Sequence, residues 1–211
     1  MKRRFGKTYR VPWRRRREGK TDYYARYKML ISKKIRAVVR KSLRHIIVQF
    51  AKGELLGDRT LSYTHSSELR KYGWKYNCGN LPAAYLTGFL AGLKAQRNNI
   101  TEAILDIGPQ RSTYGGRIYA ALKGLIDSGI EIPHNEKIFP PPERIIGKHI
   151  AEFAEKLKKE DPKYYKKQFS FYLANKILPE DITKNFFDVL KRIVKEFDAS
   201  VPDWIKETMG A

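Results

Sequence analysis

The sequence is poor in cysteine, in acidic residues and in long apolar runs. Cys78 is the single cysteine among 211 residues, which excludes an internal disulfide framework and a cysteine-rich zinc site. The uncharged run Asn77 to Leu93 has an apolar core of only about 13 residues, shorter than the ~20 that a helix needs to cross a bilayer. No apolar stretch follows the basic N-terminus, so we expect no secretory signal and a reduced, intracellular protein.

The shortage of acidic residues leaves a large and unevenly distributed positive charge. The chain carries 43 Lys and Arg against 22 Asp and Glu, a formal net charge of +21. Residues 1–41 hold 17 basic and 2 acidic residues, whereas residues 42–135 hold 11 and 7, and residues 136–211 hold 15 and 13. This distribution is typical of a polyanion-binding arm joined to a nearly neutral folded body. Nucleic acid is the expected partner, ahead of an anionic membrane surface.

Aromatic residues alternate with the charge of residues 1–30. The run Arg14 to Arg17 is accompanied by Trp13, Tyr23 and Tyr24, a combination suited to phosphates and to unpaired bases. Up to about Thr21 no helical or strand period is present, so we expect an extended segment with little structure of its own. Asp22 is predicted to cap a short helix that ends at Ile31.

The next hundred residues predict a mixed α/β fold. β-Branched residues predict strands at 36–40, 44–50 and 59–65, with turns at 41–43 and between Gly53 and Asp58, which together form an antiparallel meander. A fourth strand, 102–107, follows a helix and should lie parallel to a central strand. That helix begins after the cap Asn80 and runs to about Arg97, and we expect its Gly88 and Gly92 to contact the sheet.

A loop from Gly108 to Thr113 precedes a second apolar-striped helix, which should end at Ser128 with Gly129 as its C-cap. Two interpretations of Arg111-Ser112-Thr113 remain open and are compatible. The segment holds a phosphate at the start of the helix, or Ser112 simply caps that helix.

Proline residues from Pro133 to Pro142 predict a linker to a helical C-terminal part. Apolar stripes predict one helix through Ile150 to Leu157, a second from Asp161-Pro162 through Leu173, and a third from Pro179 through Phe197. We therefore divide the chain into a basic RNA-binding arm (1–30), a central α/β domain (31–135), and a linker with a helical extension (136–211).

Nothing in the sequence predicts catalysis, a cofactor, a metal ion or a small-molecule substrate. Gly19-Lys20-Thr21 resembles the end of a phosphate-binding loop, but Arg14 stands where that motif requires glycine. The four histidines have no partner at metal-ligand spacing, and Cys78 has no activating neighbour. The C-terminal acidic residues alternate with lysines, which is typical of a solvated helix face.

Several segments together resemble one protein family. Tyr9 to Tyr24 (YRVPWRRRREGKTDYY) is similar to the N-terminal signature of the universal large-subunit ribosomal protein family L-eighteen, in its archaeal and eukaryotic branch. Further matches follow in the same order: HIIVQ at 45–49, KYGWK at 71–75, NLPAAYLTG at 80–88, ALKG at 121–124, IPH at 132–134 and KKQFS at 166–170. The absence of a long insertion before Asp106 resembles the archaeal members.

The resemblance implies a non-enzymatic, cytoplasmic protein of the large ribosomal subunit. It implies binding to 5S rRNA and attachment of that RNA in the central protuberance, beside 23S rRNA and neighbouring ribosomal proteins. Composition alone leaves two alternatives, an RNA-processing or RNA-modifying enzyme and a DNA-architectural protein.

The residues expected to contact RNA are those of the arm, of the strands, and of three basic loops. They are Lys7, Arg10, Trp13, Arg14, Arg15, Arg16, Arg17, Lys20, Tyr23, Tyr24, Arg26, Lys28, Arg36, Arg40, Lys41, Arg44, Lys71, Lys75, Arg111, Ser112, Thr113 and Arg117.

Overall fold

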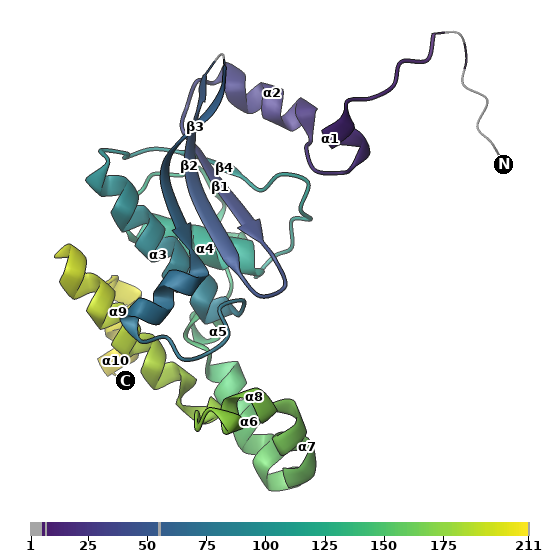
Figure 1. The fold of residues 1–211 in the computed structure, drawn as a ribbon. Helices are drawn as coiled ribbons and strands as arrows, with labels where there is room; N and C mark the ends of the chain where they lie inside the picture. Colours follow the sequence, from purple (N-terminus) through teal and green to yellow (C-terminus); the bar gives the residue numbers. More distant parts are fainter. Residues whose placement is uncertain (1–5, 7, 55, 211) are drawn as a thin grey trace.

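The computed structural model describes residue 6, residues 8–54 and residues 56–210. A four-stranded sheet forms the centre, with helices against one face (Figure 1). The N-terminal segment extends from one end of the sheet, and a group of helices from the C-terminal part projects beyond the other end (Figure 1). The predicted α/β class with a mixed sheet is confirmed.

The sheet has the order β3-β2-β1-β4, with strands β1 (Arg36–Lys41), β2 (Ile46–Glu54), β3 (Gly57–His65) and β4 (Ile104–Asp106). β1, β2 and β3 form the predicted antiparallel meander, and β4 pairs in parallel with β1, as predicted. Gly53 and Asp58 were expected in the turn but pair with each other in the ladder. A register shift between Phe50 and Ala51 precedes that pair.

One face of the sheet carries the main core. Ile46, Val48 and Phe50 are fully buried, because their alternation in β2 directs all three towards the helices. Two helices cover this face, α3 (Leu81–Arg97) and α4 (Arg117–Asp127). Asn80 caps α3 by accepting a hydrogen bond from the Ala83 amide, as predicted.

The expectation that Gly88 and Gly92 contact the sheet was wrong. A Cβ atom at Gly88 would meet the backbone of Ala121, and one at Gly92 would meet Ser128, so both glycines face α4 and its C-cap. Gly124 reciprocates, because its missing side chain leaves room for the backbone of Tyr85 and Phe89. The glycines therefore set the close approach of α3 to α4 rather than that of α3 to the sheet.

Short helices complete the N-terminal part and the body of the chain. They are α1 (Arg14–Arg17), α2 (Tyr23–Ile31), and the 3-10 helices η1 (Ser66–Tyr72) and η2 (Glu136–Ile138). Asp22 caps α2, because its carboxylate accepts from the amides of Tyr24 and Ala25. Within the described residues, no helix is long and apolar enough to span a membrane.

The C-terminal part contains more helices than the stripes predicted. They are α5 (Pro142–Ile146), α6 (Lys148–Glu160), α7 (Pro162–Gln168), α8 (Ser170–Ala174), η3 (Pro179–Asp181), α9 (Ile182–Phe197) and α10 (Asp203–Gly210). The second predicted helix is broken at Phe169, whose backbone leaves helical geometry at φ −104° and ψ 20°. Asp161 caps α7 through the amides of Lys163 and Tyr164.

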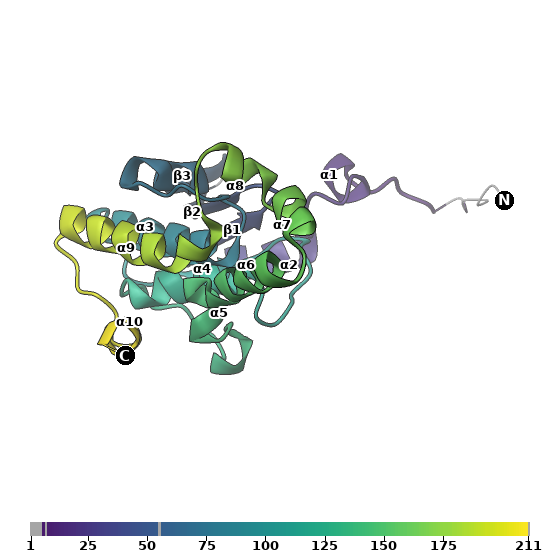
Figure 2. The same ribbon diagram turned by 90° about the horizontal axis from the view of Figure 1, so that it is seen from below.

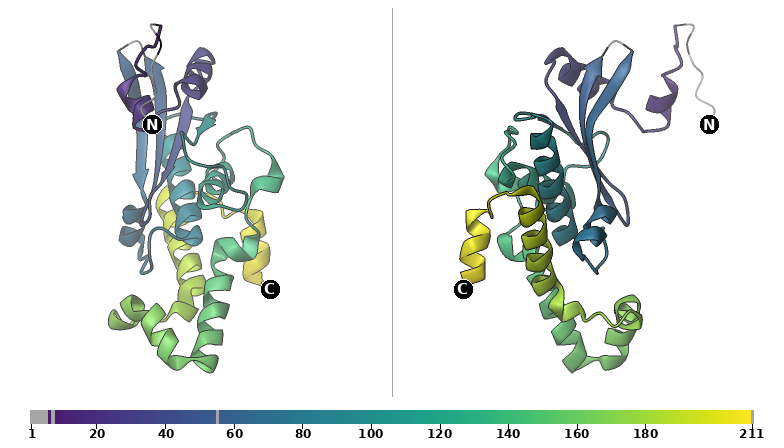
Figure 3. Two further views of the ribbon diagram at one scale, coloured as in Figure 1. Left: turned by 90° about the vertical axis from the view of Figure 1, so that its right-hand side faces the viewer. Right: turned by 60° about the vertical axis from the view of Figure 1, so that its left-hand side comes forward.

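The helices α6, α7 and α8, here called the C-terminal lobe, project from the end of the body opposite the arm (Figure 3). Figure 2 looks at the molecule from this end, so the lobe overlaps the body in that view. The lobe has its own small core of Ala154, Tyr165 and Phe169. By contrast, Phe186 of α9 and Ile205 of α10 belong to the same buried cluster as the strands of the sheet.

Candidate nucleic-acid interface

The four consecutive arginines form a short helix, α1, and not the extended segment that the sequence suggested. All four side chains are exposed, and Arg15 Nε donates to Thr21 Oγ1 at 2.9 Å. Glu18 lies 3.9 Å from Arg14 and 2.9 Å from Lys20. In the described part of the chain, Arg16 and Arg17 form no ion pair, so both guanidinium groups face solvent.

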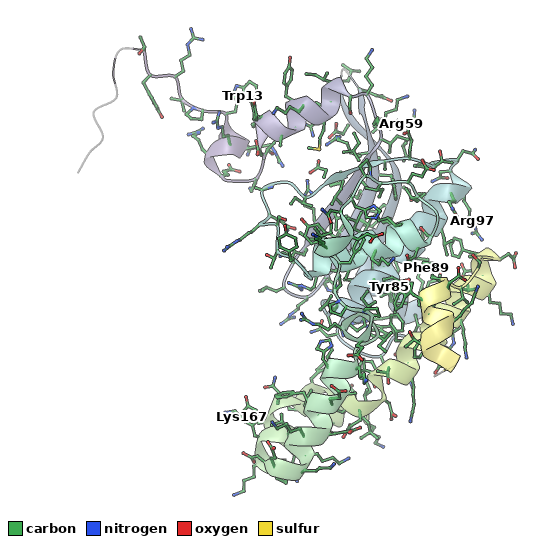
Figure 4. All side chains as sticks on the ribbon, turned by 180° about the vertical axis from the view of Figure 1, so that it is seen from behind. Trp13, Arg59, Tyr85, Phe89, Arg97 and Lys167 are labelled. Atoms are coloured by element: carbon green, nitrogen blue, oxygen red, sulfur yellow. The ribbon has the colours of Figure 1, made fainter. Side chains whose placement is uncertain are left out.

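A groove with aromatic walls lies between the segment before α1 and helix α2; we call it the aromatic groove. It encloses about 660 Å³. Trp13 meets Tyr23 edge-on, with ring centroids 4.5 Å apart. Trp13, Tyr24 and Tyr27 are 67%, 71% and 64% exposed, an unusual concentration of apolar surface within a basic segment. Trp13 is labelled in Figure 4. Arg10 and Arg16 line the same groove.

Few contacts hold α2 on the sheet. Arg26 donates two hydrogen bonds to the carboxylate of Asp58, at 2.7 and 2.9 Å. This bidentate contact lowers the pKa of Asp58 below its usual value. Leu30 of α2 packs against Gly53 on the β2–β3 hairpin. A Cβ atom added at Gly53 would collide with the side chain of Leu30. No residue of α2 is fully buried.

Two arginines expected at the RNA are instead paired inside the protein. Arg36 is 2% exposed, and its Nη1 and Nη2 lie 3.0 Å from Asp106 and 2.6 Å from Asp58. Arg40 is partly buried and bonds Asp106 at 2.9 Å. This pairing disfavours the predicted contact of Arg36 with RNA, because a buried charge needs a paired carboxylate and this one has two.

These ion pairs lie on the open face of the sheet, the face opposite α3 and α4. A hollow of about 370 Å³ opens there, bordered by α2, by the strands and by the loop after β4. Arg15, Lys20 and Thr60 line it together with the paired arginines. The open face is therefore polar and charged, in contrast to the apolar face beneath the helices.

The Arg111-Ser112-Thr113 segment does not begin a helix. Gly116 is the N-cap of α4 without a side-chain bond, and the Ser112 hydroxyl bonds the hydroxyl of Tyr119. The interpretation of Ser112 as a cap was therefore wrong, and the segment lies before the first helical turn. Ser112 and its two neighbours are exposed, so their contact with RNA stays a prediction.

Arg117 has a structural task in addition to its predicted one. Its Nη1 donates to the carbonyls of Ser42, Gly79 and Leu43, at 3.1, 2.7 and 3.4 Å. The guanidinium thus braces the β1–β2 hairpin against the segment that precedes α3, and much of its donor capacity is used inside the protein.

The other predicted contacts stay on the surface, with one outside the described residues. Arg10, Lys20, Tyr24, Lys28, Arg44, Lys71 and Lys75 are exposed, and Tyr23 and Lys41 are half-buried. Lys28 lies over the ring of Tyr24, 4.4 Å from its centroid. Lys7 is outside the residues that the structure describes.

The sequence-based list missed basic residues on the β2–β3 hairpin. Lys52 and Arg59 pair across its far end, and both are exposed. Figure 4 labels Arg59. Isolated basic residues in a strand carry no signal of their own, so only the observed pairing brings them together.

Comparison with known proteins agrees with this geometry. The family described as ribosomal large subunit proteins 60S L5 and 50S L18 matches residues 7–102 and 93–135, which include most of the arm and the whole sheet. The large ribosomal subunit protein uL18 of Korarchaeum cryptofilum (strain OPF8) is 54% identical over 187 residues, covering 88% of this chain and 94% of that protein. The chain belongs to the L5/L18 family of ribosomal proteins.

The match of this L5/L18 chain to the uL18 relative covers 187 of 211 residues, so it extends beyond residue 135 and includes the helices α5 to α8. Among the described residues, no cluster of His, Cys, Asp or Glu could hold a metal ion. Cys78 is buried, and its burial raises the pKa of the thiol, so the sulfur stays protonated and unreactive at neutral pH.

Proposed function

We propose that this L5/L18 family member is a non-enzymatic structural constituent of the large ribosomal subunit that binds 5S rRNA. In this role it attaches 5S rRNA to the subunit in the central protuberance, beside 23S rRNA and neighbouring ribosomal proteins. The proposal places the protein on cytoplasmic ribosomes. The observation that carries it is the aromatic groove surrounded by exposed arginines, in a chain of the L5/L18 family.

The arm supplies the electrostatic part of binding. RNA phosphates repel one another when a folded RNA brings strands together, and exposed guanidinium groups neutralise them through charge-assisted hydrogen bonds. Arg16 and Arg17 are available for this, because among the described residues no carboxylate pairs with them. Binding of this kind releases counterions and weakens steeply with salt.

The aromatic groove supplies a preference for irregular RNA. Trp13, Tyr24 and Tyr27 expose ring surface that can stack on bases, but only on bases that are not already stacked inside a duplex. A 5S rRNA with loops and bulges offers such bases, whereas a plain duplex does not. The arm should therefore bind duplexes through charge alone.

Filter binding of the full chain to 5S rRNA, to duplex RNA and to duplex DNA tests the proposal. We expect the highest affinity for 5S rRNA at every salt concentration. The difference in affinity between 5S rRNA and the two duplexes should become smaller for Trp13→Ala. The control Trp204→Phe should leave this difference unchanged. Equal affinity of the wild type for all three nucleic acids would contradict 5S rRNA recognition and favour a general RNA-binding or DNA-binding role.

A further inference from the structure

A wide hollow lies far from the arm, between the body and the C-terminal part of the chain. This inter-lobe cleft encloses about 1300 Å³. One wall consists of the β1–β2 hairpin and the segment 70–78 of the body. The opposite wall comes from residues 168–188, which include α8 of the lobe, η3 and the start of α9. Neither half of the sequence alone predicts the cleft, because its walls are at least 90 residues apart along the chain.

A row of aromatic side chains forms a rigid floor. Tyr76 lies 5.5 Å from Trp74 and 5.4 Å from Tyr172, measured between ring centroids. The Tyr76 hydroxyl donates to the Leu178 carbonyl at 2.6 Å, and the Tyr172 hydroxyl accepts from the Asn77 amide at 3.3 Å. These bonds join the two walls directly, so the cleft is already formed in the free protein.

The walls carry positive charge that nothing in the described structure neutralises. Four exposed basic residues line the cleft without forming an ion pair to any described carboxylate, namely Arg44, Arg70, Lys75 and Lys176. Lys184 is paired with Asp181 at 2.9 Å, and Asp188 is the other acidic residue of the lining. Burial lowers the pKa of His45, which is therefore neutral at pH 7. The cleft has a surplus of cations.

An exposed aromatic ring lines the same cleft as these cations. Phe171 is 67% exposed at the start of α8, and it lines the cleft next to the floor residue Tyr172. A large apolar ring left in water, in a cleft that unpaired cations also line, matches the chemistry of a nucleotide, which presents a flat base and a phosphate together. An acidic peptide would use the cations but leave the ring without a partner.

We propose that the inter-lobe cleft binds an unpaired segment of RNA, with phosphates at Lys75 and Lys176 and a base against Phe171. This goes beyond the proposed function of the arm, because the cleft uses other residues at the opposite end of the molecule. The chain then holds RNA at two separate places. The segment belongs to 5S rRNA or to the large-subunit rRNA, and the experiment below distinguishes the two sources.

Two pairs of matched variants of the full chain test the cleft. Lys75→Ala with Lys176→Ala removes two cleft cations, and Lys163→Ala with Lys166→Ala removes two exposed lysines of α7 outside the cleft. Affinity is measured at several salt concentrations, separately for 5S rRNA and for large-subunit rRNA. With the RNA that occupies the cleft, the first variant should lower the slope of log affinity against log salt by about 1.4, and the control should not.

A second pair of variants tests the aromatic contact. Phe171→Ala removes the ring in the cleft, and the control Tyr164→Ala removes a ring that is 46% exposed and lies outside the cleft. Phe171→Ala should weaken binding of the same RNA by at least about fivefold, as expected for one lost stacking contact of ~1–3 kcal/mol. Circular dichroism confirms that each variant is folded. If cleft and control variants behave alike with both RNAs, the cleft does not bind RNA, whatever the affinity of the intact chain for 5S rRNA.

A photoreactive benzoylphenylalanine at position 171 identifies the occupant in assembled ribosomal subunits. Crosslinks to rRNA support the proposal, and the sequence of the crosslinked RNA gives its source. Crosslinks to protein alone would overturn it and show that the cleft receives a polypeptide.

Discussion

Arg36 shows that a strongly basic chain uses part of its charge to hold itself together. Its guanidinium is buried on the open face of the sheet, between Asp58 of β3 and Asp106 of β4. Arg26 and Arg40 extend these contacts at either end, so alternating charges connect α2 to three strands. These arginines are therefore poor candidates for phosphate contacts, although their residue type and position in the sequence resemble those of the others.

Arg36→Ala should reduce the free energy of unfolding by roughly 3–5 kcal/mol, because it leaves two carboxylates without their shared partner. Urea unfolding followed by circular dichroism measures this. Arg59→Ala is the matched control, since Arg59 is an exposed arginine of β3; it should change stability by less than about 0.5 kcal/mol. Similar losses for both variants would show that the buried ion pairs add nothing specific.

Stability should also depend on pH through Asp58. Hydrogen bonds from Arg26 lower the pKa of this carboxylate from its ordinary 3.8. A lowered folded-state pKa stabilises the protein above the unfolded value, and this contribution is lost as pH falls through the folded-state value. Urea unfolding of Asp58→Asn should therefore show a smaller loss of stability below about pH 4 than the wild type. Equally steep losses in both proteins would contradict this role.

At the scale of the elements, helices are attached to the body in two different ways. α3 and α4 make the most extensive helix contact of the body through glycines that face the partner backbone. α2, by contrast, has no fully buried residue and depends on Arg26 and Leu30. The contact between α3 and α4 is therefore part of the core. The attachment of α2 to the sheet determines the position of the aromatic groove.

Gly88→Ala should destabilise the protein by roughly 1–3 kcal/mol, because the new methyl group would occupy the position of the Ala121 carbonyl and push α4 away. Thermal unfolding measures the change. Gly6→Ala is the control, since open space surrounds that glycine. An unchanged midpoint for Gly88→Ala would show that α3 and α4 tolerate a wider separation.

Arg26→Ala should release α2 from the sheet without unfolding the body. We expect faster hydrogen–deuterium exchange in residues 22–32, little change in α3, and weaker binding of 5S rRNA because the groove loses its fixed position. Lys28→Ala keeps the Asp58 contact and should leave the exchange of α2 unchanged. Unaltered exchange in Arg26→Ala would mean that Leu30 alone is sufficient to hold the helix.

At the scale of the whole molecule, local signals predicted the strands and the longer helices, whereas non-local contacts determined which surfaces these elements bury. Alternating β-branched residues predicted the strands, and Asp22, Asn80 and Asp161 indicated three helix starts, because a cap acts within a few residues. The side that Gly88 faces was not predictable, since α3 is apolar on nearly every side.

The residues of the candidate interface were likewise predictable only where local sequence determines their environment. The exposure of the α1 arginines was predictable from their own segment, because few acidic residues are close enough in sequence to pair with them. The burial of Arg36 was not, because its two carboxylate partners, Asp58 and Asp106, lie on other strands that only the fold brings beside it. The inter-lobe cleft depends on residues from Arg44 to Asp188, whose proximity only the fold creates.

The central claim is that the arm provides most of the electrostatic affinity for 5S rRNA. Residues 1–41 hold 17 basic and 2 acidic residues, and the most direct test compares the full chain with a chain lacking residues 1–20. The affinity of each for 5S rRNA is measured from low to high salt. Each lost phosphate contact lowers the slope of log affinity against log salt by roughly 0.7–0.9, so the truncated chain should lose several units of slope. An unchanged slope would contradict the account and assign the RNA contacts to the body.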